Sequence, residues 1–229
     1  MNDEAIRCII YTCDVSPLED EELFGFLEDK ANKLRKDKIK RFRSEKDKRL
    51  SLGAEYLLMK ACADFGLAYD DMAIIHEKNK KPYLVDSEHC FNLSHSGDMA
   101  ICIFSDREVG CDVESRRKID LKIAERCFSE NEYRQIMESD DREDAFLRIW
   151  TLKESFSKCL GLGLGMPLDE IDFDLSEKGH FIVKDGKRYE LHEYAKDGYH
   201  YAWCIQNDEC EDIEYAYRII DLEEMKKPQ

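Results

Sequence analysis

The hydrophobic pattern of the chain changes twice from helical spacing to strand-like alternation, and this order limits the folds that the chain can adopt. Apolar residues recur at helical spacing between Leu50 and Phe65, and again after Arg142. Each helical region is followed by short alternating runs that end in polar turns. Short consecutive strands joined by turns pair most simply as antiparallel sheets. The sequence therefore predicts an α+β fold.

The two halves of the chain repeat this order of elements, and no linker rich in Pro, Gly or Ser separates them. We expect two similar α+β subdomains, residues 1–115 and 116–229, that form a pseudo-dimer. Each is an antiparallel sheet with packed helices, and the active site lies in the cleft between them. The expected strands are 6–12, 72–76, 82–85, 91–93, 99–104, 109–114, 171–174, 180–183, 187–194, 199–205 and 214–218.

The balance of charge excludes a general nucleic-acid-binding protein. The 229 residues include 51 acidic and 35 basic side chains, which gives a formal net charge of −16. Residues 30–49 are the exception, because they contain eleven Lys or Arg and only three Asp or Glu. Such a segment indicates a site for a particular anionic ligand, and a solvated helix face is the alternative.

The sequence gives no sign of secretion or of a membrane span. Residues 1–4 are not a basic-then-apolar leader, and the longest charge-free apolar stretch, 159–168, is about half of what a membrane span requires. None of the ten cysteines forms a C-x-x-C pair, so we expect buried, reduced thiols. These features predict a cytoplasmic protein without nucleic-acid or membrane partners.

Three acidic residues are candidates for metal chemistry. Asp112 and Glu114 alternate with apolar residues in a predicted strand, so both side chains project from one face. Paired carboxylates at this spacing suit Mg²⁺ beside a phosphate, and they also occur on ordinary solvent-facing strands. Glu154 and Lys158 are four residues apart on a predicted helix. They can form a surface ion pair with each other. Alternatively, Glu154 is a third carboxylate for the metal and Lys158 is a cation that faces a phosphate.

Two further segments are compatible with phosphate binding. Residues 91–97 read Phe-Asn-Leu-Ser-His-Ser-Gly, a strand end followed by a turn with hydroxyl donors and an imidazole. Such a turn binds a phosphate or satisfies its own backbone. Residues 80–82 read Lys-Lys-Pro, which places two cations beside a rigid backbone.

Together these segments closely resemble the 4′-phosphopantetheinyl transferases of the Sfp-like class. The resemblance covers most of residues 34–168 and depends on two motifs about forty residues apart. It implies that the enzyme moves the 4′-phosphopantetheine arm from coenzyme A to a serine of an apo acyl or peptidyl carrier protein. It also implies a requirement for Mg²⁺ and the release of 3′,5′-adenosine bisphosphate. The motifs read Gly110-x-Asp112-x-Glu114 and Trp150-x-x-Lys153-Glu154-Ser155-x-x-Lys158.

The resemblance also implies a role for each matched residue. Asp112 and Glu114 are expected to bind Mg²⁺, and Glu154 is expected to be a further ligand or the general base. Lys158 is expected to stabilise the departing bisphosphate. The positions expected to contact coenzyme A are Arg35, Lys38, Arg49, Lys81, Pro82, Ser94, His95, Lys153 and Lys158.

Two other functions use the same residues. One is a non-catalytic module that binds coenzyme A or a carrier protein, and the presence of all three carboxylates with Lys158 argues against it. The other is a Mg²⁺-dependent phosphodiesterase that hydrolyses coenzyme A. The sequence leaves the carrier protein and its pathway open. Two internal halves allow one chain to supply the whole cleft, which favours a monomer.

Overall fold

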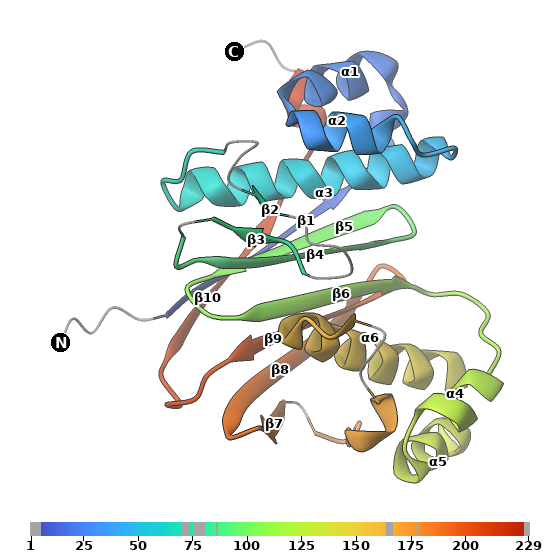
Figure 1. The fold of residues 1–229 in the computed structure, drawn as a ribbon. Helices are drawn as coiled ribbons and strands as arrows, with labels where there is room; N and C mark the ends of the chain where they lie inside the picture. The colour runs from blue at the N-terminus through green and yellow to red at the C-terminus, as the bar shows by residue number, and fades with distance from the viewer. Residues whose placement is uncertain are drawn as a thin grey trace.

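The protein is a stack of four layers in the order helices, sheet, sheet, helices (Figure 1). This arrangement comes from a computed structural model that describes residues 6–69, 74–75, 81–85, 87–163, 167–177 and 179–226. The helices are α1 (Glu21–Lys30), α2 (Lys33–Ile39), α3 (Glu45–Asp64), α4 (Lys122–Cys127), α5 (Glu130–Glu138) and α6 (Arg142–Leu160). Short 3-10 helices lie at Ser16–Glu19, Leu168–Glu170 and Glu223–Lys226.

Two four-stranded sheets form the centre of the molecule. The first has the order β10-β1-β5-β4 and the second the order β6-β9-β8-β7. A two-stranded ribbon of β2 and β3 completes the described strands. The strands are β1 (Ile6–Asp14), β2 (Ile74–Ile75), β3 (Tyr83–Leu84), β4 (Cys90–Ser96), β5 (Met99–Ser105), β6 (Val109–Ser115), β7 (His180–Lys184), β8 (Lys187–Lys196), β9 (Tyr199–Gln206) and β10 (Ile213–Ile219).

The predicted α+β class is confirmed, and the two halves of the chain exchange strands. β10 pairs with β1 in the first sheet, and this pair is parallel, whereas the other pairs are antiparallel. β6 pairs with β9 in the second sheet, although it precedes the expected boundary at residue 115. The division into residues 1–115 and 116–229 therefore stays a proposal, with strands that cross it in both directions.

The central strands β1, β5 and β9 are buried on both faces. On one face of the first sheet, Tyr11 and Phe104 pack against apolar residues of α3 such as Leu57. The second sheet packs in the same way against Leu152 and Phe156 of α6. Between the sheets lies a third apolar layer from β1, β5, β6 and β9: Cys8, Ile10, Ile101, Ile103, Val109, Cys111, Val113, Tyr201, Trp203 and Ile205.

The two sheets meet along their edge strands β4 and β6. No backbone ladder joins these strands in the described sheets, and side chains bridge them instead. Asn92 Oδ1 on β4 accepts a hydrogen bond from the backbone N–H of Cys111 on β6, at 3.0 Å. We call this junction the β4–β6 seam. α2 and α3 lie on one side of the seam and α6 lies on the other (Figure 1).

Local signals in the sequence located most element ends. Ser129 and Glu132 form a capping box at the start of α5. Gly161 adopts a left-handed conformation with a φ of 71° and ends α6, as expected for a helix stop. Residues 171–174, which we expected to form a strand, are irregular. The expected strand 72–76 lies only partly within the described residues.

Within the described part of the chain, no helix is both long and apolar enough to span a membrane. All ten cysteines are free thiols, and most of them are buried. Cys111, between the paired carboxylates, is fully buried, and burial raises its pKa to about 12. This thiol is therefore protonated and inert near neutral pH, as the sequence predicts.

Candidate active site

A cavity of about 490 Å³ lies over the β4–β6 seam. Its walls come from α2 and α3 on one side, from β4 and β6 at the base, and from α6 on the other side. It brings together nine of the residues that the resemblance singled out, and they come from segments far apart in the chain. These are Arg35, Lys38, Pro82, Ser94, His95, Asp112, Glu114, Glu154 and Lys158.

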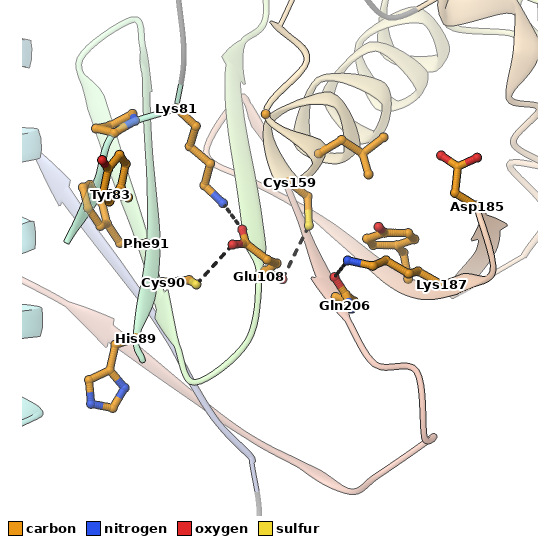
Figure 2. A pocket seen from close by; sticks show the side chains of 14 residues that line it. Lys81, Tyr83, His89, Cys90, Phe91, Glu108, Cys159, Asp185, Lys187 and Gln206 are labelled. Carbon is orange, nitrogen blue, oxygen red and sulfur yellow. Dashed lines mark hydrogen bonds and ion pairs between the residues drawn. The ribbon is translucent and has the colours of Figure 1, made fainter. Parts of the chain in front are cut away.

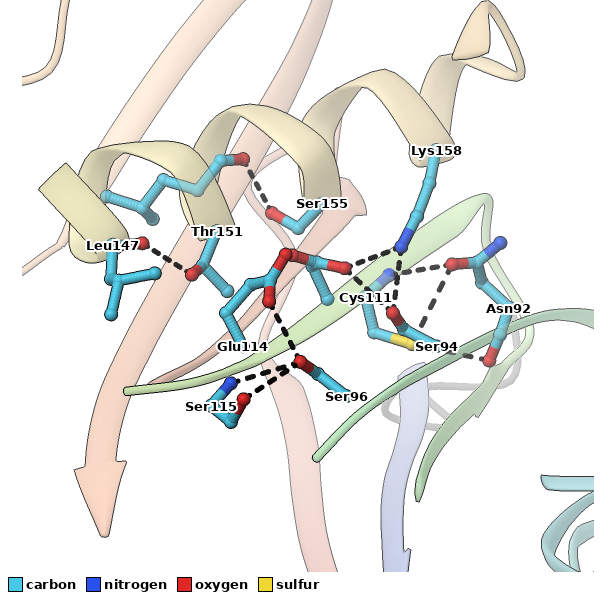
Figure 3. A network of polar contacts seen from close by, with 12 residues as sticks. Asn92, Ser94, Ser96, Cys111, Glu114, Ser115, Leu147, Thr151, Ser155 and Lys158 are labelled. Carbon is cyan, nitrogen blue, oxygen red and sulfur yellow. Dashed lines mark hydrogen bonds and ion pairs between the residues drawn. The ribbon is translucent and has the colours of Figure 1, made fainter. Parts of the chain in front are cut away.

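Asp112 and Lys158 form an ion pair at the base of the cavity. Lys158 Nζ lies 2.6 Å from Asp112 Oδ1, and Ser94 Oγ donates to the same oxygen at 2.7 Å. Lys158 also donates to Ser94 Oγ at 2.9 Å (Figure 3). Burial opposes the charge of Lys158, but Asp112 raises its pKa above the usual value. Asp112 Oδ2 is buried and has no hydrogen-bond partner among the described residues.

Glu114 is held in a similar way one step along β6. Ser96 Oγ donates to Glu114 Oε2 at 2.9 Å (Figure 3), and Arg117 Nη1 donates to the same oxygen. The Ser96 hydroxyl in turn accepts the backbone N–H of Ser115 at 3.1 Å. Alternation along β4 places Ser94 and Ser96 on one face of the strand, so each hydroxyl meets one carboxylate of β6.

Glu154 is the carboxylate of the cavity with the fewest contacts among the described residues. It lines the cavity from α6, and it has no hydrogen bond or ion pair among the residues that the structure describes. Burial raises its pKa, and the nearby carboxylates Asp112 and Glu114 add to the shift. The surface ion pair between Glu154 and Lys158, which the sequence left open, is not formed, because Lys158 turns toward Asp112 instead.

The opposite wall of the cavity is basic. Arg35 is held by Glu55, with Nε 2.6 Å from Glu55 Oε2, and it donates to Ser51 Oγ at 3.0 Å. Lys38 lies one helical turn further along α2, and burial together with the charge of Arg35 lowers its pKa. His95 faces the same cavity from the end of β4. Two basic side chains and an imidazole that line one side of a cavity form a candidate anion site.

Two of the expected coenzyme A contacts, Lys81 and Arg49, do not line the seam cavity. Lys81 donates to Glu108 at 2.8 Å and to the Val109 carbonyl at 2.6 Å, and it lines a neighbouring cavity of about 630 Å³ (Figure 2). Arg49 does not line the seam cavity, and it pairs with Glu19 at 3.2 Å. Pro82 lines both cavities and joins them.

Lys153 requires a correction. Its side chain is fully buried, on the far side of α6 from the cavity, and its ammonium lies 2.8 Å from the fully buried Glu132. It also donates to the carbonyl of Ile171. Neighbouring residues on a helix point about 100° apart, and here Lys153 points toward α5 while Glu154 points toward the cavity. The structure gives Lys153 a structural role, not contact with a phosphate.

Sequence reasoning missed several residues of the site. Ser96 lies in the quoted segment 91–97, and only the two-residue period of a strand distinguishes it as a partner of Glu114. Arg117 follows the same strand, three residues after Glu114, and was not considered. Asn92 bridges the two sheets. Ser96 and Asn92 act across the seam, which is not visible in the sequence, whereas Arg117 contacts Glu114 from the end of the same strand.

Gly110 explains why α6 can lie so close to β6. A Cβ atom at this position would lie 2.1 Å from the Ser155 carbonyl oxygen and 2.3 Å from the Cys159 backbone nitrogen. Both atoms belong to the backbone of α6 and cannot move without the helix. The glycine of the Gly-x-Asp-x-Glu motif therefore sets the distance between the carboxylates of β6 and the residues of α6.

Gly110→Ala is expected to destabilise the protein by about 1–3 kcal/mol, because the added methyl overpacks this contact. It should also slow the reaction, since α6 carries Glu154 and Lys158 away from β6. Thermal unfolding and a transfer assay check both effects. Gly25→Ala is the control, because nothing lies within 4 Å of a Cβ built there. An unchanged melting temperature and rate in Gly110→Ala would contradict this view of the contact.

The carboxylates of the cavity fit Mg²⁺, although their side chains do not yet lie close enough together to bind one ion. Among the described residues, no three His, Cys, Asp or Glu side chains are already grouped to hold a metal ion. However, within the described residues Asp112 Oδ2 is a buried oxygen without a partner, and the Glu154 carboxylate has no hydrogen bond or ion pair. Both line the same cavity as Glu114. Unpaired carboxylate oxygens are the ligands that Mg²⁺ prefers.

Comparisons with known proteins agree with this geometry. Residues 108–217 match the model of the 4′-phosphopantetheinyl transferase superfamily, and residues 21–106 match a 4′-phosphopantetheinyl transferase N-terminal model. The 4′-phosphopantetheinyl transferase gsp of Aneurinibacillus migulanus is 32% identical over 192 residues, which cover 81% of this chain and 80% of the relative. The 4′-phosphopantetheinyl transferase Sfp of Bacillus subtilis is 30% identical over 174 residues, 74% of this chain and 76% of the relative.

A vertebrate protein is also similar to this chain. The L-aminoadipate-semialdehyde dehydrogenase-phosphopantetheinyl transferase of Xenopus laevis is 31% identical over 192 residues. The match covers 75% of this chain and 62% of that protein. The two family models meet between residues 106 and 108, immediately before β6.

Proposed function

From the premise that this chain belongs to the 4′-phosphopantetheinyl transferase family, we propose how the seam cavity performs the reaction. Enzymes of this family transfer the phosphopantetheine arm of coenzyme A to a carrier protein, and this chain is such a transferase. The observation that carries the proposal is the meeting of a basic wall and three carboxylates in one cavity.

The basic wall receives the phosphates of coenzyme A. Arg35, Lys38 and His95 face the cavity from one side. Burial and the charge of Lys158 lower the pKa of His95, so the imidazole is neutral when the cavity holds no anion. A bound phosphate would relieve the repulsion among these groups and hold the nucleotide end of coenzyme A against α2.

The three carboxylates that line the cavity would hold Mg²⁺. Asp112, Glu114 and Glu154 are the proposed ligands, with Glu154 as a ligand or as the general base. When bound, the ion neutralises charge on the pyrophosphate oxygens and on the leaving group. Burial raises the pKa of Asp112 and Glu154, and a cation among the carboxylates would favour their ionised forms.

The residues of the chain supply the remaining chemistry. The serine hydroxyl of the carrier attacks the β-phosphorus of coenzyme A, a new P–O bond forms, and the bond to the 3′,5′-adenosine bisphosphate breaks. As the general base, Glu154 would accept the serine proton, for which its carboxylate and raised pKa are suited. Lys158, held over the base of the cavity by Asp112 and Ser94, stabilises the negative charge of the departing bisphosphate.

We also propose that the protein works as a monomer in the cytoplasm. Both walls of the cavity come from one chain, so a second copy is not needed to complete the site. The ten free thiols are compatible with a reducing compartment. The net charge of −16 disfavours nucleic acid as a partner.

The function is tested by incubating the purified protein with Mg²⁺, coenzyme A and a panel of apo carrier proteins from fatty-acid, polyketide and peptide pathways. The mass of at least one carrier should increase by one phosphopantetheine arm. Relative rates across the panel identify the preferred carrier. Omitting the carrier serves as the control, because release of adenosine bisphosphate without it would indicate a phosphodiesterase. No mass gain on any carrier would contradict the proposal.

A further inference from the structure

The two carboxylates of β6 share one pattern of contacts. In Asp112, one oxygen accepts from a serine of β4 and from Lys158, while the other oxygen has no partner in the described chain. In Glu114, Oε2 accepts from Ser96 and from Arg117, and no partner of Oε1 is found among the described residues. Each carboxylate therefore has one occupied oxygen and one available oxygen.

We infer that Ser96 is a positioning residue that fixes Glu114 so that its free oxygen faces the metal ion. This inference rests on the proposed function, because it assigns a role toward the proposed Mg²⁺ ligand. Ser96 lies at the end of β4, and its hydroxyl is itself oriented by the backbone N–H of Ser115. The hydroxyl accepts from that N–H and donates to Glu114 Oε2, so both of its roles are defined.

The physical reason is the cost of ordering a glutamate side chain. A partly exposed glutamate has several rotamers, and binding a metal ion selects one of them. When hydrogen bonds already fix the ligand in the folded protein, its side-chain entropy is lost during folding and not during metal binding. Ser96 suits this role because it is neutral, so its removal changes no charge near the ion. Arg117 donates to the same oxygen, but its positive charge also repels a divalent cation.

Binding of Mn²⁺ tests the inference without any measurement of turnover. The free Mn²⁺ signal in electron paramagnetic resonance is followed during titration of the protein saturated with coenzyme A, and coenzyme A alone is subtracted. Ser96→Ala and Ser96→Cys should each raise the Mn²⁺ Kd about tenfold, because a methyl group cannot donate and a thiol donates weakly. Ser96→Thr keeps the hydroxyl and should bind Mn²⁺ like the wild type.

Ser115→Ala is the matched control. Its hydroxyl forms only a long contact of 3.4 Å with that of Ser96, and the backbone N–H that orients Ser96 remains in the variant, so Mn²⁺ binding should be unchanged. Coenzyme A binding without metal, and thermal unfolding, should be equal in all variants. Ser96→Ala with wild-type Mn²⁺ affinity would overturn the inference, as would weaker coenzyme A binding without metal. If the wild type itself binds no Mn²⁺, the proposed metal site fails first, and the inference fails with it.

Discussion

Glu154→Gln is expected to lower the rate of carrier modification by about 10²–10⁴-fold, the usual contribution of a general acid or base. The substitution keeps the shape of the side chain and removes its charge and basicity. Glu154 has no hydrogen bond or ion pair among the described residues, so the variant breaks none of the described contacts that hold the fold together. Coenzyme A should still bind, because the basic wall is intact.

The rate is measured by the mass of the carrier, and coenzyme A binding is measured by calorimetry. Glu143→Gln on the same helix is the control, because Glu143 lies near the start of α6 and does not line the cavity. It should retain the wild-type rate. Mn²⁺ binding to Glu154→Gln then distinguishes the two roles, since loss of the ion indicates a ligand and retention indicates a base. Turnover of Glu154→Gln at the wild-type rate would exclude both roles.

Lys153→Met is expected to destabilise the protein by about 3–5 kcal/mol, because it leaves a buried carboxylate without its partner. Lys153 and Glu132 both have 0% of their side chains exposed. Burial lowers the pKa of Lys153 and raises that of Glu132, so neither charge is stable in this place without the other. Glu132 also accepts the backbone N–H of Phe173 at 3.0 Å, so the pair joins α5, α6 and the segment before β7.

Denaturant unfolding measures this effect. The double variant Glu132→Gln, Lys153→Met should recover part of the loss, because no unpaired charge remains. Lys48→Met is the control, since Lys48 pairs with the exposed Glu45 on the surface of α3, and such pairs contribute about 0–1 kcal/mol. If Lys153→Met keeps its stability and instead weakens coenzyme A binding, the sequence-based role of Lys153 would be restored.

The sequence was sufficient to predict the site where the period of a strand determines which way a side chain points. The two-residue period of a strand predicts that Asp112 and Glu114 share a face, and both line the cavity. The same reasoning located the strands around them. Lys153 shows the limit, because a motif gives the type and order of residues but does not say which face of a helix another helix will cover. α5 covers that face, and its position depends on contacts distant in the sequence.

Alternation also predicted one strand that does not form. Ile171 and Phe173 are buried, as the alternating pattern indicates, but residues 171–174 have no neighbouring strand to pair with. The pattern predicts which side chains are buried, but it does not predict whether another strand lies beside the backbone to form hydrogen bonds with it. For the same reason the sequence did not reveal that β10 lies parallel to β1, because the choice of partner depends on the whole fold.

The pairing of β1 with β10 has a consequence for synthesis of the chain. Residues 6–12 emerge from the ribosome long before their partners, residues 213–219. Until then β1 keeps one unpaired edge, which is open to pairing with other chains. The first sheet is therefore complete only after residues 213–219 have been synthesised, and we expect it to reach its final stability at that late stage.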